Sequence, residues 1–556
     1  MNSQNYTWNT VKGFHDYPEL IKNIFIKVNK NERREFSNWI GEIGKKNQTD
    51  IDWWSIPLTS RNPKITEIFN SICIIETTKK LIQKKINLKI IVDSKNLFDL
   101  ITKLKKNKTN KIKVILINKN KLFANLFLFL KSIAFQILTF SFIKIFIPQK
   151  KIINNNVNLI YTYPSLIGNK HERLFQIPKN RLKEFNKRSI FIPTFIITPQ
   201  ILKIFFLIKK LAKENYIFKE HVLTFQDLAH SYMHFKRIKK FNIKYKLYKS
   251  VDYSKSIFDE VNSFDGIFTR TTCILNYLFV KKISKEKLKI KKAICWLENQ
   301  PEKCWTYAIR KYFPKTNTLG YQGYADLPQL MNTIPSKHEA EAKIIPEKII
   351  LINKIYNNVR KEFFKKLNTC VGPALIYQNI FKRSHTNINK KIDILVVLGE
   401  FQSINEGLLQ WIIKIQSKLT KYKILIKKPK IFNIKHLIEI KNLQSNIELT
   451  DDNLANLMIN SKILISSGPT AASIEGLAYG CYLINPLLDP FDPFFISNLN
   501  ISKKNYFTAK NFEDFFTEIT NFLNNYKNLK KTMIKPEKLK NLFFTKTNAH
   551  NIKLFL

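Results

Sequence analysis

Residues 463–480, ILISSGPTAASIEGLAYG, decide the fold of the C-terminal half. The first four are apolar or small and predict a short buried strand, and Ser-Ser-Gly-Pro after them predicts a turn. Proline suits the first turn of a helix, so we expect a helix that starts at Thr470. A strand, a glycine turn and a helix in this order are typical of a doubly wound α/β sheet.

Glycine positions are informative because the chain has only 13 glycines in 556 residues. Gly468, Gly476 and Gly480 lie in this stretch, and Gly399 ends another apolar run, 392–398. Glycine is needed where the backbone has a positive φ or where a ligand approaches closely. Ligands of open α/β sheets bind outside the carboxyl ends of the strands. The sequence therefore predicts a ligand site at this sheet edge.

Alternating strand and helix patterns divide the rest of the chain. We expect an N-terminal α/β domain over 1–380, a polar linker over 381–391 and a C-terminal α/β domain over 392–535. Residues 536–556 read as a basic, poorly defined tail. Short apolar runs predict the strands of both domains, among them 266–269 and 293–297 in the N-terminal one.

The turn at 466–470 has the groups to bind a phosphate. Free N–H groups and the positive dipole end of the following helix favour an anion. Ser466, Ser467 and Thr470 add hydroxyl donors, and Glu475 is placed to accept from ribose hydroxyls. The alternative is a capped helix after a core strand, with Glu475 merely solvated.

The segment 466–480 resembles the donor-nucleotide motif of GT-B glycosyltransferases. The chain as a whole is similar to bacterial surface-carbohydrate (polysaccharide) biosynthesis proteins, in order over roughly 50–500. The matching elements are Trp53-Trp54, Ser60-Arg61-Asn62-Pro63, 298–301 (ENQP), 320–322 (GYQ) and 371–375 (VGPAL). One position departs from the pattern: where these proteins often have His-Pro, this chain has Lys428-Pro429. Lysine pairs with a phosphate as a point charge and is no neutral imidazole donor.

The resemblance implies a GT-B-like fold, with two Rossmann-like doubly wound domains that face each other across a cleft. It implies donor binding in the C-terminal domain, acceptor binding in the N-terminal one, and a base that takes the acceptor proton. For the base we expect Glu298, which follows a strand, with His338 and Asp326 as alternatives. The donor residues would be Gly399, Lys427, Lys428, Ser466, Ser467, Gly468, Thr470 and Glu475. The acceptor residues would be Trp53, Trp54, Arg61, Tyr321 and Gln322, with Trp53-Trp54 as core residues in the competing interpretation.

Residues 122–148, LFANLFLFLKSIAFQILTFSFIKIFIP, are apolar enough to meet a membrane. Lys131 interrupts the segment, and a charge at a helix centre costs about 2.5–3.5 kcal/mol on insertion scales. An in-plane or re-entrant anchor, a buried core helix and a true span are all open. Basic flanks favour anionic headgroups.

Composition sets the remaining limits. The formal net charge is +51, but Lys is spread along the chain, as codon drift in an AT-rich genome would leave it, which argues against nucleic acid as a partner. The six cysteines form no CxxC pair, so we expect free thiols and neither a metal site nor a cofactor. The polar N-terminus lacks a secretory signal.

Together these features predict a membrane-peripheral glycosyltransferase on the cytoplasmic face of the plasma membrane. It would move a sugar from a nucleotide-sugar to a cell-surface polysaccharide or lipid-linked glycan precursor. A polyol-phosphate transferase on the same fold and an inactive GT-B scaffold that binds a glycan or a partner enzyme are the alternatives.

Overall fold

The computed structural model describes residues 5–556 with gaps in between. The residues left out are 106–111, 118–121, 151–155, 165–173, 197–199, 242, 244–245, 265, 287, 299, 326–329, 383–389, 430–442, 469, 491–498 and 500. Most of the expected linker and Asp326 therefore lie outside the described residues.

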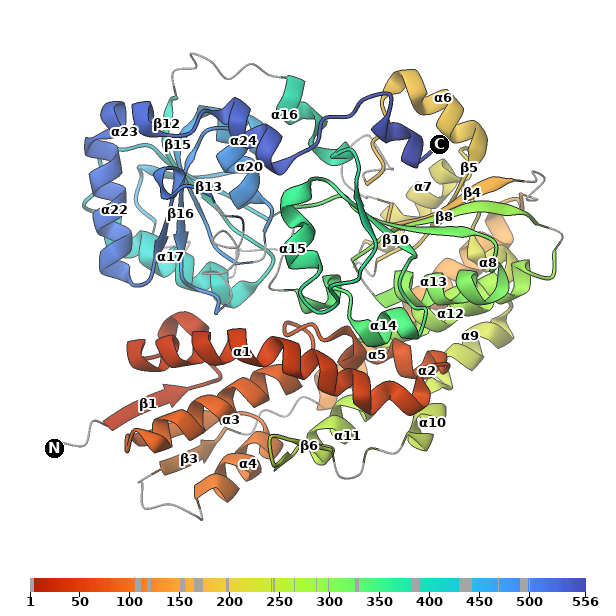
Figure 1. Ribbon diagram of the computed structural model, residues 1–556, viewed down its shortest axis with the longest axis horizontal. Coiled ribbons are helices and arrows are strands. Elements are labelled where there is room, and N and C mark those ends of the chain that lie inside the picture. The colour runs from red at the N-terminus through yellow and green to blue at the C-terminus, as the bar shows by residue number, and fades with distance from the viewer. Residues whose placement is uncertain are drawn as a thin grey trace.

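The C-terminal domain is a six-stranded parallel sheet in the order β14-β13-β12-β15-β16-β17. Numbered along the chain, this is 3-2-1-4-5-6, the order of a Rossmann sheet. The strands are β12 (Ile392–Val397), β13 (Ile424–Lys427), β14 (Ile447–Thr450), β15 (Ser461–Ser466), β16 (Tyr482–Pro486) and β17 (Tyr506–Ala509). The blue and cyan part of Figure 1 shows this domain.

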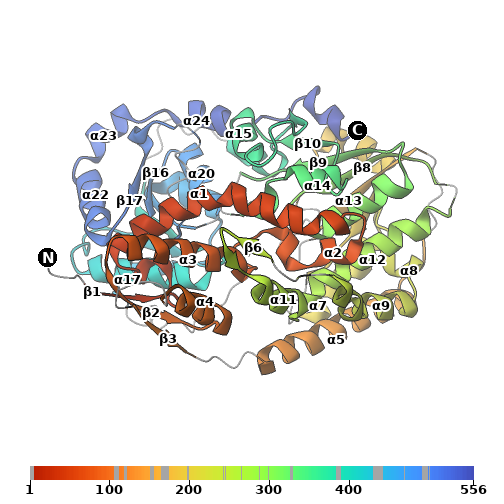
Figure 2. The same cartoon turned by 60° about the horizontal axis from the view of Figure 1, so that its bottom comes forward.

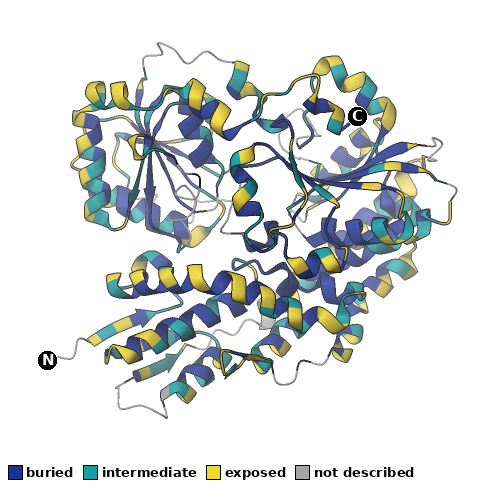
Figure 3. Ribbon diagram, in the orientation of Figure 1, coloured by how far each residue is buried: buried dark blue, intermediate teal, exposed yellow. Residues whose placement is uncertain are grey.

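Both faces of this sheet are covered, which is why its strands are continuous apolar runs. Along β12, Ile394 and Val396 pack toward α17 (Gln402–Gln416) and α22 (Phe512–Asn524). Leu395 and Val397 belong to the core on the opposite face, which also holds apolar residues of α19 (Leu454–Asn460) and α20 (Ala472–Ala478). The dark blue strands of Figure 3 show this burial.

The N-terminal half contains two parallel sheets. The smaller has the order β1-β2-β3, with β1 (Asn5–Asn9), β2 (Asn87–Val92) and β3 (Ile112–Leu116). Helices α1 (Glu19–Gly44), α3 (Glu67–Gln83) and α4 (Lys95–Lys105) belong to the same unit, below the other two parts in Figure 1. The prediction of one α/β domain over 1–380 did not separate this unit.

The larger sheet of the N-terminal half has six parallel strands in the order β11-β10-β9-β8-β4-β5. They are β4 (Val157–Thr162), β5 (Ser189–Pro193), β8 (Ile290–Trp296), β9 (Asn317–Gln322), β10 (Lys348–Leu351) and β11 (Thr369–Val371). One face shares a core with α12 (Ile267–Ile283) and α13 (Gln300–Tyr312), and the other shares a core with α7 (Ile201–Leu211). The predicted class, two doubly wound α/β domains in a GT-B-like arrangement, is confirmed.

The expected strand at 266–269 is wrong. Gly266 has a positive φ of 66°, and α12 begins directly after it. The short apolar run Ile267-Phe268-Thr269 is the first turn of that helix, since periodicity alone does not distinguish a strand from a buried helix segment.

The last residues are folded and return to the N-terminal half. Helix α24 (Pro536–Phe543) packs on α20, and the turn η9 (Asn551–Leu554) lies against the larger N-terminal sheet. The ring of Phe555 lies 5.0 Å from that of Tyr321 on β9. The expectation of a poorly defined tail is wrong, because spaced apolar residues (Leu539, Phe543, Ile552, Phe555) anchor this lysine-rich segment.

The apolar insertion is one long helix, α5 (Leu122–Phe146), of which Leu126–Phe146 is apolar enough to cross a membrane. One face is buried through Phe135, Phe140 and Ile143. The other exposes large apolar side chains: Leu126, Phe127, Leu128, Leu130, Ile137, Leu138, Ile145 and Phe146. Figure 2 shows α5 along the lower rim of the molecule.

Candidate functional site

The turn after β15 forms where the sequence predicts it. Gly468 has a φ of +80°, and a Cβ there would lie 2.7 Å from Cδ1 of Ile404. A side chain at this position would therefore be strained and crowded. Gly476 allows α20 to lie close to β15, since a Cβ there would be 2.2 Å from Leu464.

The hydroxyl groups of this turn are partly used within the fold. Ser467 Oγ donates to the carbonyl of Pro486 at 2.9 Å, and Thr470 Oγ1 accepts from the N–H of Ala472 at 3.2 Å. Helix α20 begins at Ala472, two residues later than expected, because Thr470 acts as a local cap. Ser466 Oγ is buried and has no partner among the described residues.

Glu475 lies in the first turn of α20 and is partly exposed. Among the described residues no group donates a hydrogen bond to its carboxylate. Burial raises the pKa of Glu475 to about 7 from the usual 4.5. Nearly all buried polar groups in proteins are hydrogen-bonded, so an uncompensated carboxylate needs an explanation.

The neighbouring strand ends bring Gly399 and two lysines to the same sheet edge. Nothing lies within 4 Å of the Cβ position of Gly399, whose N–H and C=O are both bonded to the Asn405 amide. Lys427 ends β13 and is buried, whereas Lys428 Nζ pairs with exposed Asp451 at 2.7 Å. The space beside Gly399 is open to a ligand.

Glu298 follows β8 at the carboxyl edge of the larger N-terminal sheet. Its Oε2 accepts from Trp296 Nε1 at 2.8 Å, and its N–H donates to Glu302 Oε1 at 3.1 Å. Buried Glu302 also accepts from Tyr163 Oη at 2.8 Å, so it fixes the loop after β8. The side chain of Glu298 itself remains partly exposed.

The hydroxyl of Tyr377 relates the two carboxylates. Burial raises the pKa of Tyr377 well above its usual value, and the charges of Glu475 and Glu298 raise it further. This hydroxyl accepts from the N–H of Ala325 at 3.2 Å. The structure thus brings the expected ribose acceptor and the expected base, from opposite domains, to one buried group that the sequence did not single out.

His338 lies away from these carboxylates. It is on α14 (Lys337–Glu341), and its ring covers Gly41 of α1, where a Cβ would lie 2.0 Å from Cδ2. Its nearest charged groups are Glu42, with Nε2 to Oε1 at 3.6 Å, and Glu341. This position contradicts the expectation of His338 as the base, since the ring packs between two helices.

The predicted acceptor residues are structural. Trp53 and Trp54 are 1% and 5% exposed. Tyr321 is a core residue of β9, not a loop residue, and its hydroxyl donates to the carbonyl of Pro373 at 2.8 Å. Gln322 Nε2 donates to the carbonyl of Thr333 at 2.9 Å. The idea that these side chains meet a sugar is not supported, because protein groups cover them.

Arg61 forms a buried ion network. Its guanidinium donates to Glu339 Oε2 at 2.6 Å and to Ser37 Oγ at 2.8 Å, and Lys303 Nζ donates to Glu339 Oε1 at 2.7 Å. Burial alone would raise the pKa of Glu339, but Arg61 and Lys303 bring it below its usual value. Arg61 therefore holds its segment in place and is not an acceptor contact.

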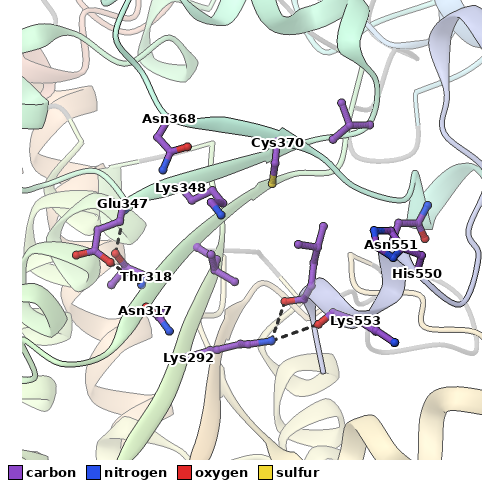
Figure 4. A pocket seen from close by; sticks show the side chains of 13 residues that line it. Lys292, Asn317, Thr318, Glu347, Lys348, Asn368, Cys370, His550, Asn551 and Lys553 are labelled. Atoms are coloured by element: carbon purple, nitrogen blue, oxygen red, sulfur yellow. Dashed lines mark hydrogen bonds between the residues drawn. The ribbon is translucent and has the colours of Figure 1, made fainter.

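Other sites in the described part of the chain have different chemistry. Within that part no group of three or more His, Cys, Asp or Glu side chains could hold a metal ion. The pocket of Figure 4, about 670 Å³, lies at the amino ends of the larger N-terminal sheet, near Lys292, Asn317 and Lys348. It contains none of the predicted site residues.

Comparisons with known proteins give weak likenesses. No protein-family model and no curated protein matches the chain. Trehalose 6-phosphate synthase of Burkholderia multivorans has 8% identity and a TM-score of 0.39, covering 72% of this chain and 94% of the other. The glycosyltransferase SnogD of Streptomyces nogalater has 10% identity and a TM-score of 0.38, covering 70% and 95%. MnaA of S. aureus, solved with UDP, has 10% identity and a TM-score of 0.39, covering 70% and 93%. With scores this low, the fold assignment here depends on the strand orders.

Proposed function

We propose that this chain is a glycosyltransferase that takes a sugar from a nucleotide-sugar donor. The observation that carries the proposal is Glu475, a carboxylate without a hydrogen-bond donor among the described residues, beside the Gly468 turn on a Rossmann sheet. Ribose hydroxyls of a bound nucleotide would supply the missing donors. The phosphates would then lie over the turn that begins at Ser466.

The reaction follows from the two carboxylates. Glu298 would take the proton of an acceptor hydroxyl, whose oxygen would bond to the anomeric carbon while the bond from that carbon to the nucleotide phosphate breaks. Trp296 Nε1 orients Glu298, and Glu302 fixes its backbone. Negative charge on the departing phosphate would be stabilised by Lys427 and by backbone N–H groups of the turn.

We further propose that the acceptor is a cell-surface polysaccharide or lipid-linked glycan precursor, met at the cytoplasmic face of the plasma membrane. Helix α5 supports this, since it exposes a row of apolar side chains on one face. Its other face packs into the fold, where Gln136 Nε2 donates to Thr271 Oγ1 of α12 at 2.8 Å. Those contacts favour a helix that lies in the membrane plane over one that spans it.

A ligand panel tests the donor site. Purified protein is heated with UDP, GDP, CDP, CMP and their activated sugars and polyols, since a ligand of the native state raises the melting temperature. We expect one nucleotide to stabilise the wild type and to lose its effect in Glu475→Gln. The matched control is Glu448→Gln, at an exposed position of β14. An unchanged nucleotide effect in Glu475→Gln contradicts the site.

Vesicle co-sedimentation tests the membrane face. Phe127→Lys with Leu130→Lys places two charges on the exposed face of α5, and we expect binding to mixed phosphatidylcholine and phosphatidylglycerol vesicles to fall about tenfold or more, since each charge is costly in an apolar phase. Leu449→Lys, in the C-terminal domain, is the control. Equal sedimentation of both variants contradicts the membrane role of α5.

A further inference from the structure

The segment Ser60-Arg61-Asn62-Pro63 has a role that the site described above does not include. Arg61 has a left-handed φ of 59° and is tied down by the buried network with Glu339. Asn62 Oδ1 accepts from the N–H of Lys64 at 3.0 Å, and the Pro63 carbonyl accepts from Asn70 Nδ2 at 3.1 Å. A backbone held at this many points presents the next side chain, Lys64, in a fixed direction.

Lys64 reaches from the N-terminal half into the C-terminal domain. Its Nζ donates to Oδ2 of Asp489, a carboxylate with no exposed surface. The same ammonium stands 5.1 Å from the centre of the Phe401 ring. Phe401 lies in the loop after β12, and Asp489 lies in the loop after β16.

The order of the strands places this ammonium opposite the predicted phosphate turn. In the sheet, β15 lies between β12 and β16. The turn after β15 touches both flanking loops, since the Gly468 backbone packs on Ile404 and Ser467 Oγ donates to Pro486. A group that contacts the loops on both sides therefore straddles the turn between them.

The ammonium has donors to offer. Lysine carries three N–H donors, and the described residues show one acceptor for them, Asp489. The Lys64 side chain is 20% exposed, so a ligand can reach it. Asp489 keeps the ammonium charged and oriented, while Phe401 supports it from the side.

We infer that Lys64 binds the diphosphate of the nucleotide-sugar and so completes the donor site from the other half of the chain. This inference rests on the proposed function. Its ligand class is a nucleoside diphosphate, and the contact is a charge-assisted hydrogen bond from Nζ to a phosphate oxygen.

Calorimetric titration of the full-length protein tests the inference. The probes are UDP, GDP, CDP and ADP, each compared with its monophosphate and its nucleoside, on wild type and Lys64→Met. We expect the variant to bind the nucleoside as the wild type does and the diphosphate about tenfold or more weakly, the factor for 1.4 kcal/mol. Lys64→Arg, which keeps the charge, should retain most of the diphosphate affinity.

The control is Lys462→Met. Lys462 Nζ pairs with Asp393 at 2.6 Å and is similarly part-buried, but both residues begin their strands and so lie at the opposite edge of the same sheet. This variant should bind every probe as the wild type does. If Lys64→Met does not fold because Asp489 is left unpaired, the double variant Lys64→Met with Asp489→Asn removes both charges and should show the same selective loss.

The outcomes separate the inference from the proposed function. If the wild type binds none of these probes, the proposed function fails. If the wild type binds a diphosphate and Lys64→Met binds it within twofold of the wild type, Lys64 does not touch the phosphates and the inference is overturned. A loss that is equal for nucleoside and diphosphate also overturns it, because it shows a structural role alone.

Discussion

Replacing Glu475 with glutamine should make the protein more stable at alkaline pH while it weakens nucleotide binding. Burial raises the pKa of Glu475 to about 7 from 4.5, so the folded state holds this proton more tightly than the unfolded chain does. Between these two values the folded protein binds more protons, and the free energy of unfolding falls as pH rises. Glutamine at this position has no proton to lose.

The magnitude follows from the two pKa values. At about 1.36 kcal/mol per pKa unit, the charged carboxylate costs the fold about 3 kcal/mol above pH 7. Solvent at the partly exposed side of Glu475 screens part of this, so we expect a gain of about 1–3 kcal/mol for Glu475→Gln at pH 8. For a domain of 150–250 residues each kcal/mol raises the melting temperature by about 2–4 °C.

Melting curves of wild type and Glu475→Gln from pH 5 to pH 8 measure this effect. The two proteins should be alike near pH 5 and should separate as pH rises. Ribose hydroxyls that bond to the charged carboxylate should also release about half a proton on nucleotide binding at pH 7, which calorimetry in buffers of different ionisation enthalpy detects. Parallel pH profiles, with no proton release, would refute the reasoning.

Three further substitutions have predicted costs. Glu339→Gln leaves Arg61 buried without its counter-charge and should cost about 3–5 kcal/mol in urea unfolding, whereas an unchanged midpoint contradicts the network. Gly468→Ala puts a side chain at a φ of +80° and should lower stability by about 1–3 kcal/mol, measured the same way. Although burial opposes it, hydrogen bonds from His234 and Arg237 lower the pKa of Asp52 to about 2, so Asp52→Asn should cost about 2 kcal/mol at pH 7 and much less near pH 2.

The strands of the C-terminal domain could be predicted because both of their faces are buried. Runs such as 392–398 and 463–466 have no polar alternation, and glycine marks the end of each. The same reasoning misassigned 266–269, where a short apolar run starts a helix. Apolar runs this short have no period of their own, so tertiary packing decides between strand and helix.

The site was predictable on one side only. Glu475 and the Gly468 turn lie in a continuous strand–turn–helix segment, so local spacing determines their place. The Trp53-Trp54 pair could not be assigned in the same way, since an aromatic pair suits a core and a sugar platform equally well. Whether such rings are covered depends on helices distant in sequence, here α12 and α13.

The departure at Lys428 gains meaning from the contacts of Lys64. At the end of β13, Asp451 pairs with Lys428 at 2.7 Å and lies 3.9 Å from Lys427, so part of the positive charge there is already neutralised. A departing diphosphate needs charge that is fixed in place and turned toward it. Lys64 meets that need, since Asp489 orients it and a pinned backbone carries it. Because that backbone belongs to the N-terminal half, phosphate binding and the contact between the two halves become a single event. The conformation that holds the leaving group is then also the one that brings Glu298 toward the donor.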